Sequence, residues 1–167
     1  MLIKEQFKIL SKSKIRAGEA LKEGLYPFFT SSDSRIKRIN EYIYDDELMN
    51  LGTGGVLSRN YYNGKFTVST DNFVLKSFGS IMPKFLYYFL RYDNLSVLKK
   101  EYKGVGLQHI SKPYVENINI PVFSQEKQEE VIKNLDYINY SLENCKKHLS
   151  FLNQLINSRF IGQEVAA

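Results

Sequence analysis

Residues 124–160 read SQEKQEEVIKNLDYINYSLENCKKHLSFLNQLINSRF, and this stretch decides how the chain is organised. It holds no proline or glycine, the two residues that most readily interrupt a helix. Ser124 is suited to cap the first turn, which carries Glu126, and Arg159 stands in the last turn, where a cation is favoured. We therefore predict one helix over residues 124–160, about 55 Å long at about 1.5 Å per residue.

Apolar residues recur along this helix at alternating steps of four and three, which is the heptad pattern of a coiled-coil seam. A helix of this length cannot bury such a seam against a domain half as long, so it needs a partner helix. On this interpretation Cys145 is a small buried hydrophobic residue rather than a nucleophile. The expected dimer interface consists of Val131, Leu135, Ile138, Leu142, Cys145, Leu149, Leu152 and Ile156.

The part of the chain before this helix has a different composition. Residues 1–123 contain 18 Lys and Arg against 12 Asp and Glu, whereas residues 124–167 contain 5 against 6. A basic part that is also rich in aromatic residues favours a polyanionic partner such as nucleic acid. We therefore expect a domain over residues 1–123, the dimerising helix over 124–161 and a tail over 162–167.

Strand and helix signals alternate irregularly in residues 1–123, which indicates an α+β domain with a mixed or mostly antiparallel sheet. Asn63-Gly64, between strand-prone residues, predicts a tight hairpin turn. After it, Phe66 and Val68 alternate with the polar residues 65, 67 and 69, so we expect one buried face and one solvent-facing face.

Further elements follow along the chain. We expect a strand over residues 72–75, a helix with Pro83 in its first turn, a short helix after Ser111 and a short edge strand over residues 119–121. The buried stripe of the helix after Pro83 is predicted to be Phe85, Leu86, Phe89 and Leu90.

No stretch has the pattern of a catalytic centre. The segment Leu51–Gly55 lacks the ending of a P-loop and the spacing of a dinucleotide fold; it is either a tight turn or a loop that admits a DNA phosphate. Glu101-Tyr102-Lys103 echoes the Glu-x-Lys of metal-dependent nucleases, but a chance triplet is the favoured explanation. His109 and His148 have no Cys or second His nearby, which argues against zinc. We expect no catalytic residue, no metal and no cofactor bound by this chain.

The longest apolar run, Phe85–Leu90, is far shorter than the roughly 20 residues of a membrane span. The first residues lack the pattern of a signal peptide. A single cysteine excludes an internal disulfide framework. We therefore expect a cytoplasmic protein that does not contact the membrane.

Basic side chains are interleaved with aromatic and amide residues in three places on the front domain. Lys and Arg neutralise phosphates, whereas Asn, Gln and Arg can read base edges. One such cluster is more often a solvated face, but three on one basic domain favour a DNA-binding surface. The candidates are Arg35, Lys37, Arg38, Thr53, Gly54, Arg59, Asn60, Asn63, Lys65, Lys99, Lys100, Lys103, Gln108, His109 and Lys112.

Several segments, taken in order, resemble the specificity subunits of type I restriction–modification systems. EGLYPFFTSS at residues 23–32 resembles the beginning of a target-recognition domain, and LGTGG at 51–55 with KFTVSTDNF at 65–73 resembles its middle. YKGVGLQHIS at 102–111 is similar to its closing glycine loop. Residues 119–128 are similar to the junction with the family's conserved helix, and Ser158-Arg159-Phe160 to the end of that helix.

The resemblance implies a non-catalytic subunit whose domain reads one half of a split target in double-stranded DNA. It also implies that the helix pairs antiparallel with another helix as a ruler. The implied partners are a methyltransferase subunit, which binds S-adenosylmethionine, and a translocating restriction subunit that can join.

This sequence departs from the family pattern in length. Family members carry two domains and two helices, whereas this sequence has one of each, so we expect a homodimer or pairing with another half-subunit. It also lacks tryptophan and the Gly-Gly-Thr-Pro beginning that many members have. A native half-subunit, a fragment and the product of a rearranged gene all stay open.

Two other functions stay open at this point. One is an adaptor, in which the helix recruits a protein and the basic domain is incidental; an exposed seam without DNA affinity would favour it. The other is a metal-dependent nuclease, which DNA cleavage with Mg²⁺ in the absence of partners would favour.

Overall fold

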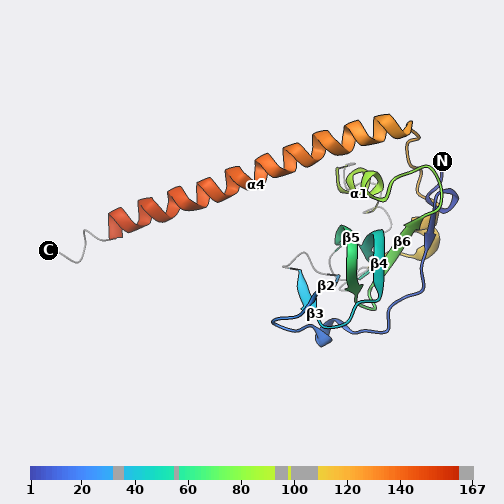
Figure 1. The fold of residues 1–167 in the computed structure, drawn as a ribbon, viewed down its shortest axis with the longest axis horizontal. Helices are drawn as coiled ribbons and strands as arrows, with labels where there is room; N and C mark the ends of the chain where they lie inside the picture. Colours follow the sequence, from blue (N-terminus) through green and yellow to red (C-terminus); the bar gives the residue numbers. More distant parts are fainter. Residues whose placement is uncertain (32–35, 55–56, 93–97, 99–108, 162–167) are drawn as a thin grey trace. The chain divides into compact units, whose positions relative to one another are not determined.

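A computed structural model describes residues 1–31, 36–54, 57–92, 98 and 109–161. The chain divides into two compact units, Met1–Glu129 and Glu130–Ala167. The first unit contains a mixed sheet with short helices, and the second consists of the greater part of one long helix (Figure 1). This confirms the expected α+β class with a long helix towards the C-terminus.

Six strands form one sheet in the described residues, in the spatial order β1-β6-β4-β5-β2-β3. Every neighbouring pair is antiparallel except β2 and β5, which are parallel. Short 3-10 turns, η1 (Ile3–Glu5) and η2 (Ala17–Glu19), lie on either side of β1 in the sequence. The strands are β1 (Phe7–Ile9), β2 (Tyr26–Phe29), β3 (Lys37–Ile39), β4 (Tyr44–Gly52), β5 (Arg59–Val68) and β6 (Asn72–Ser77).

Asn63 and Gly64 lie in the middle of β5, so the predicted hairpin turn is wrong. Asn63 is paired with Glu47 and Gly64 with Asp46, within one continuous register that joins β5 to β4. The residues on both sides of Asn63-Gly64 pair with the same long neighbour instead of with each other. Gly64 has a φ of 124°, which glycine adopts far more readily than other residues. The glycine thus distorts a strand and does not reverse the chain.

One hydrophobic cluster lies on one face of the central strands and contains the buried residues Phe29, Leu48, Phe66, Val68 and Val74. The expected alternation after Gly64 is wrong, because Thr67 and Ser69 are buried as fully as their apolar neighbours. The Thr67 hydroxyl is satisfied inside the fold: it donates to the Glu41 carbonyl at 2.8 Å and accepts from the Ile43 amide at 3.1 Å. A strand between two neighbours can be covered on both faces, and alternation then fails.

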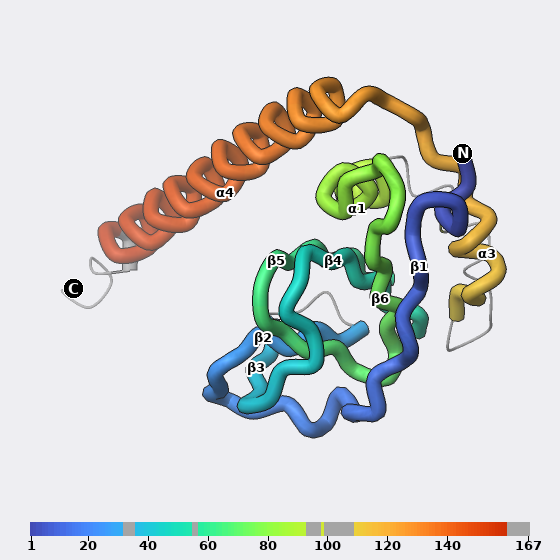
Figure 2. The backbone as a smooth tube through the Cα atoms, turned by 45° about the vertical axis from the view of Figure 1, so that its right-hand side comes forward, coloured from blue at the N-terminus to red at the C-terminus, as the bar shows by residue number. Residues whose placement is uncertain are grey.

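Helix α1 (Pro83–Tyr92) lies against β4 and β5 (Figure 2). Pro83 stands in its first turn as predicted, and Phe85, Leu86 and Leu90 are buried. Phe89 is only half-buried, and Tyr88 takes the expected buried place instead. The predicted strand over residues 72–75 is confirmed as part of β6.

The short helix predicted after Ser111 is confirmed as α3 (Lys112–Glu116), with the Ser111 hydroxyl accepting from the Tyr114 amide at 3.3 Å. The edge strand expected over residues 119–121 is reduced to a single bridge between Asn119 and Leu2. Nearby, the Ile3 amide donates to the Ile118 carbonyl at 3.0 Å, and Lys4 donates to the Asn117 side chain at 2.7 Å. Residues 1–4 are therefore joined to residues 117–120.

Helix α4 (Gln125–Ile161) has 37 residues, close to the predicted range. Ser124 caps it as expected, since its hydroxyl accepts from the Lys127 amide at 3.3 Å. Hydrogen bonds from the backbone amide of Glu126 and from Ser124 hold the pKa of the Glu126 carboxyl below its usual value. This agrees with the favourable place of an anion in a first helical turn.

Two buried glutamines hold the segment that leads into α1. The Gln6 carboxamide oxygen accepts from the Ser80 amide at 2.7 Å. The Gln128 oxygen accepts from the Met82 amide at 2.9 Å, and its nitrogen donates to the carbonyls of Ser80 and Phe123 at 3.0 and 3.1 Å. Gln128 is fully buried, and the first turn of α4 belongs to the first unit.

Candidate nucleic-acid interface

The predicted DNA-binding residues fall into several separate places in the structure. Arg35, Lys99, Lys100, Lys103 and Gln108 lie outside the described residues. The other ten candidates are distributed over β3, the end of β4, β5 and the segment around α3.

Thr53, Gly54 and His109 come together although they are far apart in the sequence. Gly54 and His109 form an antiparallel bridge, and the Thr53 carbonyl accepts from the Ile110 amide at 3.1 Å. A Cβ atom on Gly54 would lie 2.9 Å from the His109 ring. The bare backbone of Gly54 thus accommodates this imidazole. Thr53 and Gly54 are buried, and His109 is the exposed member of the three.

Lys65, on β5, belongs to a cluster with two tyrosines. Its ammonium group lies 4.8 Å from the centre of the Tyr42 ring, and the rings of Tyr42 and Tyr26 are 5.0 Å apart in an edge-to-face arrangement. Tyr42 and Lys65 are both exposed. We call Tyr26, Tyr42 and Lys65 the Tyr42 cluster.

Two further predicted cations lie on the strand beside this cluster. Lys37 is paired with Phe28 of β2, and Phe28 is paired with Thr67 of β5. Two strand spacings, roughly 9–10 Å, therefore separate the backbone at Lys37 from that at Thr67. The structure thus brings Lys37, Arg38 and Lys65, which come from two different sequence clusters, to one end of the sheet.

Arg59 and Asn60 are occupied within the fold. The Arg59 guanidinium donates to the Leu90 carbonyl in the last turn of α1 at 3.4 Å. The Asn60 amide donates to the side-chain oxygen of the buried Asn50 at 3.0 Å. Arg59 and Lys65 are six residues apart on β5, which corresponds to about 20 Å at 3.3 Å per residue. They therefore mark two separate ends of one strand.

Asn63 and Lys112 are exposed. Lys112 lies 3.6 Å from Glu116 in an exposed ion pair on α3, and such pairs contribute little to stability. Its charge is partly offset by this neighbour, whereas Asn63 presents an amide from the middle of β5.

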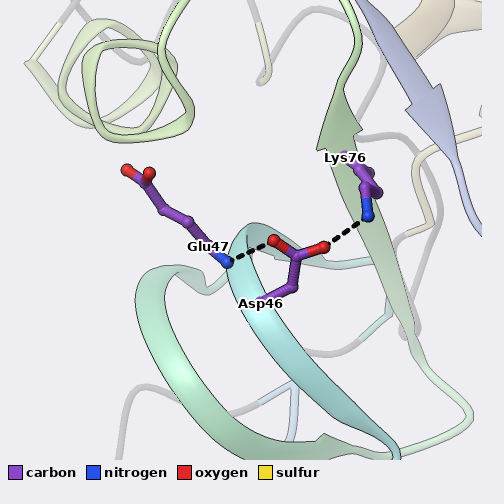
Figure 3. A network of polar contacts seen from close by, with 3 residues as sticks. All are labelled: Asp46, Glu47 and Lys76. Carbon is purple, nitrogen blue, oxygen red and sulfur yellow. Dashed lines mark hydrogen bonds and ion pairs between the residues drawn. The ribbon is translucent and has the colours of Figure 1, made fainter.

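A polar network on β4 was not predicted from the sequence. Asp46 accepts a hydrogen bond from Lys76 of β6 and another, at 2.8 Å, from the Glu47 amide (Figure 3). The hydrogen bond from Lys76, and then that from the Glu47 amide, hold the pKa of Asp46 below its usual value. The network offsets one of the domain's positive charges on β6.

A larger cluster on α1 was also missed by the sequence analysis. It consists of Tyr61 from β5 and Lys84, Tyr87, Tyr88, Arg91 and Tyr92 from α1; we call these six residues the α1 cluster. Arg91 donates a hydrogen bond to the Tyr87 hydroxyl, and its guanidinium lies 5.6 Å from the ring centres of both Tyr87 and Tyr92. Lys84, Tyr87 and Arg91 recur at helical spacing, so the signal was present in the sequence beside the buried stripe.

The heptad seam is largely exposed on α4. Val131 and Leu135 are half-buried, whereas Ile138, Leu142, Cys145, Leu149, Leu152 and Ile156 are exposed. Leu149 shows 61% of its surface and Leu152 53%, which is unusual for regularly spaced large apolar residues. Phe151 and Leu155 are exposed beside the seam.

The described residues include no group of three or more His, Cys, Asp or Glu side chains able to hold a metal ion. None of the helices in the described ranges is long and apolar enough to cross a membrane.

Residues 1–156 match the protein family described as "Type I restriction modification DNA specificity domain". The chain belongs to this family, as its sequence segments indicated. It is 29% identical over 147 residues to the type I restriction enzyme EcoDI specificity subunit of Escherichia coli, covering 88% of this chain. It is 27% identical over 142 residues to the MjaVIII specificity subunit of Methanocaldococcus jannaschii, covering 79% of this chain.

The chain spans about a third of the length of these relatives, 32% and 33% respectively. Solved structures show the same fold. The S subunit of a type I restriction-modification system from M. genitalium matches with a TM-score of 0.75 at 18% identity, over 93% of this chain and 42% of that one. The HsdS subunit from Thermoanaerobacter tengcongensis matches with a TM-score of 0.61 at 19% identity, over 89% and 38%.

Proposed function

We propose that this chain reads one half of a bipartite DNA target and that two such chains pair through α4. The observation that carries this proposal is the exposed apolar seam on a helix that follows a single recognition unit. Relatives about three times as long belong to the same family. One recognition unit can read only one part of such a target, and α4 is the element that can bring a second unit to the other part.

The chain supplies recognition, and its partners supply the chemistry. A methyltransferase subunit holding S-adenosylmethionine modifies an adenine in each half of the target, and a restriction subunit joins the complex. The basic side chains around the Tyr42 cluster support contact with DNA, because Lys and Arg at one end of the sheet can neutralise phosphates. Arg38 and Asn63 are exposed side chains that can reach base edges.

Pairing of identical copies has a consequence for the target. A dimer with a two-fold axis binds DNA whose half-sites obey the same symmetry. The target should therefore be a split palindrome, with two inverted half-sites on either side of bases that are not read.

A charge in the seam tests the pairing. Leu142→Lys places a cation among apolar side chains, where an unpaired buried charge costs several kcal/mol, so we expect a monomer in sedimentation at micromolar concentration. Tyr140→Lys is the matched control, since Tyr140 lies outside the seam and is 68% exposed. Equal dimerisation of both variants would contradict pairing through the seam, and a monomeric wild type would point to a different half-subunit.

Methylation mapping tests recognition. The chain is expressed with a type I methyltransferase subunit, and methylated adenines are located across the host genome. A split target that depends on this chain supports the proposal. Partner binding without any DNA affinity would instead favour the adaptor function, for which the exposed seam is the supporting observation.

A further inference from the structure

The α1 cluster presents two cations on a surface made of tyrosine rings. Lys84 lies 5.4 Å above the Tyr61 ring, and Arg91 lies against the rings of Tyr87 and Tyr92. Beneath them, Tyr88 packs against Tyr87 and Tyr92 at ring distances of 5.0 and 6.0 Å, and Tyr88 is 5% exposed. Rings packed in this way restrict the cations to few conformations, which lowers the entropy cost of binding an anion.

The stability of the helix does not explain both cations. Arg91 stands in the last turn of α1, where the helix dipole favours a positive charge. Lys84 stands in the first turn, where the same dipole disfavours one. The helix dipole therefore does not account for Lys84, which lies over the Tyr61 ring.

Charge decides which partner fits this surface. The described helix α1 carries Lys84 and Arg91 and no acidic residue. Glu47, whose carboxylate accepts from the Tyr61 hydroxyl at 2.9 Å, contributes one negative charge from β4. Arg59 adds a further cation through its hydrogen bond to the Leu90 carbonyl. Lys, Arg and Tyr side chains are the groups that commonly contact DNA phosphates.

The spacing of the two cations also suits a phosphate backbone. Lys84 and Arg91 are two helical turns apart, a rise of about 10 Å. One strand of B-DNA winds around the duplex axis, so its successive phosphates lie about 7 Å apart, roughly twice the axial rise of about 3.4 Å. A separation of about 10 Å therefore falls within two nucleotide steps. A surface with cations at this spacing can contact two phosphates of one strand.

We propose that the α1 cluster is a phosphate-binding surface for the DNA backbone, separate from the Tyr42 cluster. This inference rests on the proposed function, because it assumes that the first unit binds DNA. The α1 cluster positions the duplex by charge and does not read bases. Side chains that can reach base edges, such as Arg38 and Asn63, are left to specify the sequence.

The test is the double variant Lys84→Gln with Arg91→Gln, measured as DNA affinity against salt concentration. Losing two phosphate contacts lowers the slope of log affinity against log salt by about 1.8, at about 0.9 per contact. When the salt is raised from 50 to 200 mM, the fold-loss of DNA affinity should therefore be about ten times smaller in the variant than in the wild type. The loss relative to wild type should be equal for the methylated target and for an unrelated sequence.

The matched control is Lys8→Gln with Lys22→Gln, which removes the same net charge from two exposed lysines outside both clusters. It should change the slope by much less than the α1 double variant. Equal changes in the two double variants would overturn the proposal, because they would show a general effect of net charge. Circular dichroism of each variant verifies that the fold is retained.

Tyr87→Phe tests the positioning of the Arg91 guanidinium separately from its charge. It keeps the ring beneath Arg91 but removes the hydroxyl that accepts its hydrogen bond. We expect a few-fold loss of affinity with an unchanged salt slope, since the number of phosphate contacts stays the same. A lower slope in Tyr87→Phe would contradict this positioning role.

The outcomes distinguish this proposal from the one on which it rests. A wild-type chain that binds no DNA, alone or with a methyltransferase subunit, overturns the proposed function and this inference with it. A wild type that binds, with an unchanged slope in the α1 double variant, overturns this inference alone. Loss of methyltransferase binding with unchanged DNA binding would show that the α1 cluster contacts a protein.

Discussion

Lengthening α4 tests whether the helix sets the distance between two half-sites. Seven residues inserted after Leu142 preserve the heptad phase and add about 10 Å to the helix. In an antiparallel pair both helices lengthen, so the two recognition units move apart by the same amount. At about 3.4 Å per base pair, the unread spacer should grow by about three base pairs.

The same insertion rotates the second half-site around the DNA axis without an equal rotation of the recognition unit. Three base pairs turn B-DNA by about 100°, at about 10–10.5 base pairs per turn, whereas seven residues return the helix to within about 20° of its starting rotation. The lengthened target should therefore be methylated less efficiently. Three heptads add about 31 Å, which is about nine base pairs and nearly a full turn of DNA. This longer insertion should recover efficiency at a spacer about nine base pairs longer.

Methylation mapping of wild type and both insertion variants, each with the same methyltransferase subunit, measures spacer and efficiency together. The half-site sequences should stay unchanged in all three. A spacer of unchanged length in both insertion variants would refute the claim that α4 sets the distance between the half-sites. An asymmetric wild-type target would show that the natural partner is a different half-subunit.

Three further predictions concern the first unit. Gln128→Ala leaves buried backbone groups without partners and should lower the free energy of unfolding by about 1–3 kcal/mol. Gln125→Ala, at an exposed position of the same turn, should change this free energy by less than about 0.5 kcal/mol. Equal effects of the two variants in urea denaturation would contradict the contacts described. Gly24→Ala places a Cβ 2.7 Å from the backbone of β3 and should lower the free energy of unfolding by about 1–3 kcal/mol. In the control Gly18→Ala, the added Cβ meets nothing within 4 Å, so this variant should be neutral or slightly stabilising. Asp46→Asn should cost about 0.2–1 kcal/mol at pH 7. The pKa of Asp46 is lower in the folded chain than its ordinary 3.8, so this difference should be fully present above pH 3.8 and disappear as the pH falls through the lower folded-state pKa. A difference that does not shrink on acidification would refute the ion pair's role.

The features that sequence predicted well depend on neighbours along the chain. The cap at Ser124, the first turns at Pro83 and Ser111, and the length of α4 follow from helical period and local capping. These rules need no knowledge of what packs against the helix. The segments that resemble the family follow one another along the sequence, so the family could also be predicted from the sequence alone.

The features that sequence missed depend on residues far apart in the chain. Asn63-Gly64 has the local chemistry of a turn, but β4 is long enough to pair with both sides of it. The role of Gly54 depends on His109, which lies 55 positions later. The α1 cluster needs Tyr61 from β5 beneath a helix whose sequence was interpreted only for its buried stripe.

The contacts of the first unit impose an order on its synthesis. Residues 1–4 bond to residues 117–120, and the segment around Ser80 bonds to Gln128. A growing chain emerges from the ribosome N-terminus first, so the bonds of residues 1–4 cannot form before residue 120 has emerged, and the bond to Gln128 cannot form before the first turn of α4 has emerged. The remaining part of α4, which carries the seam, follows after that point. A nascent chain can therefore complete its recognition unit before it exposes enough of the seam to capture another copy.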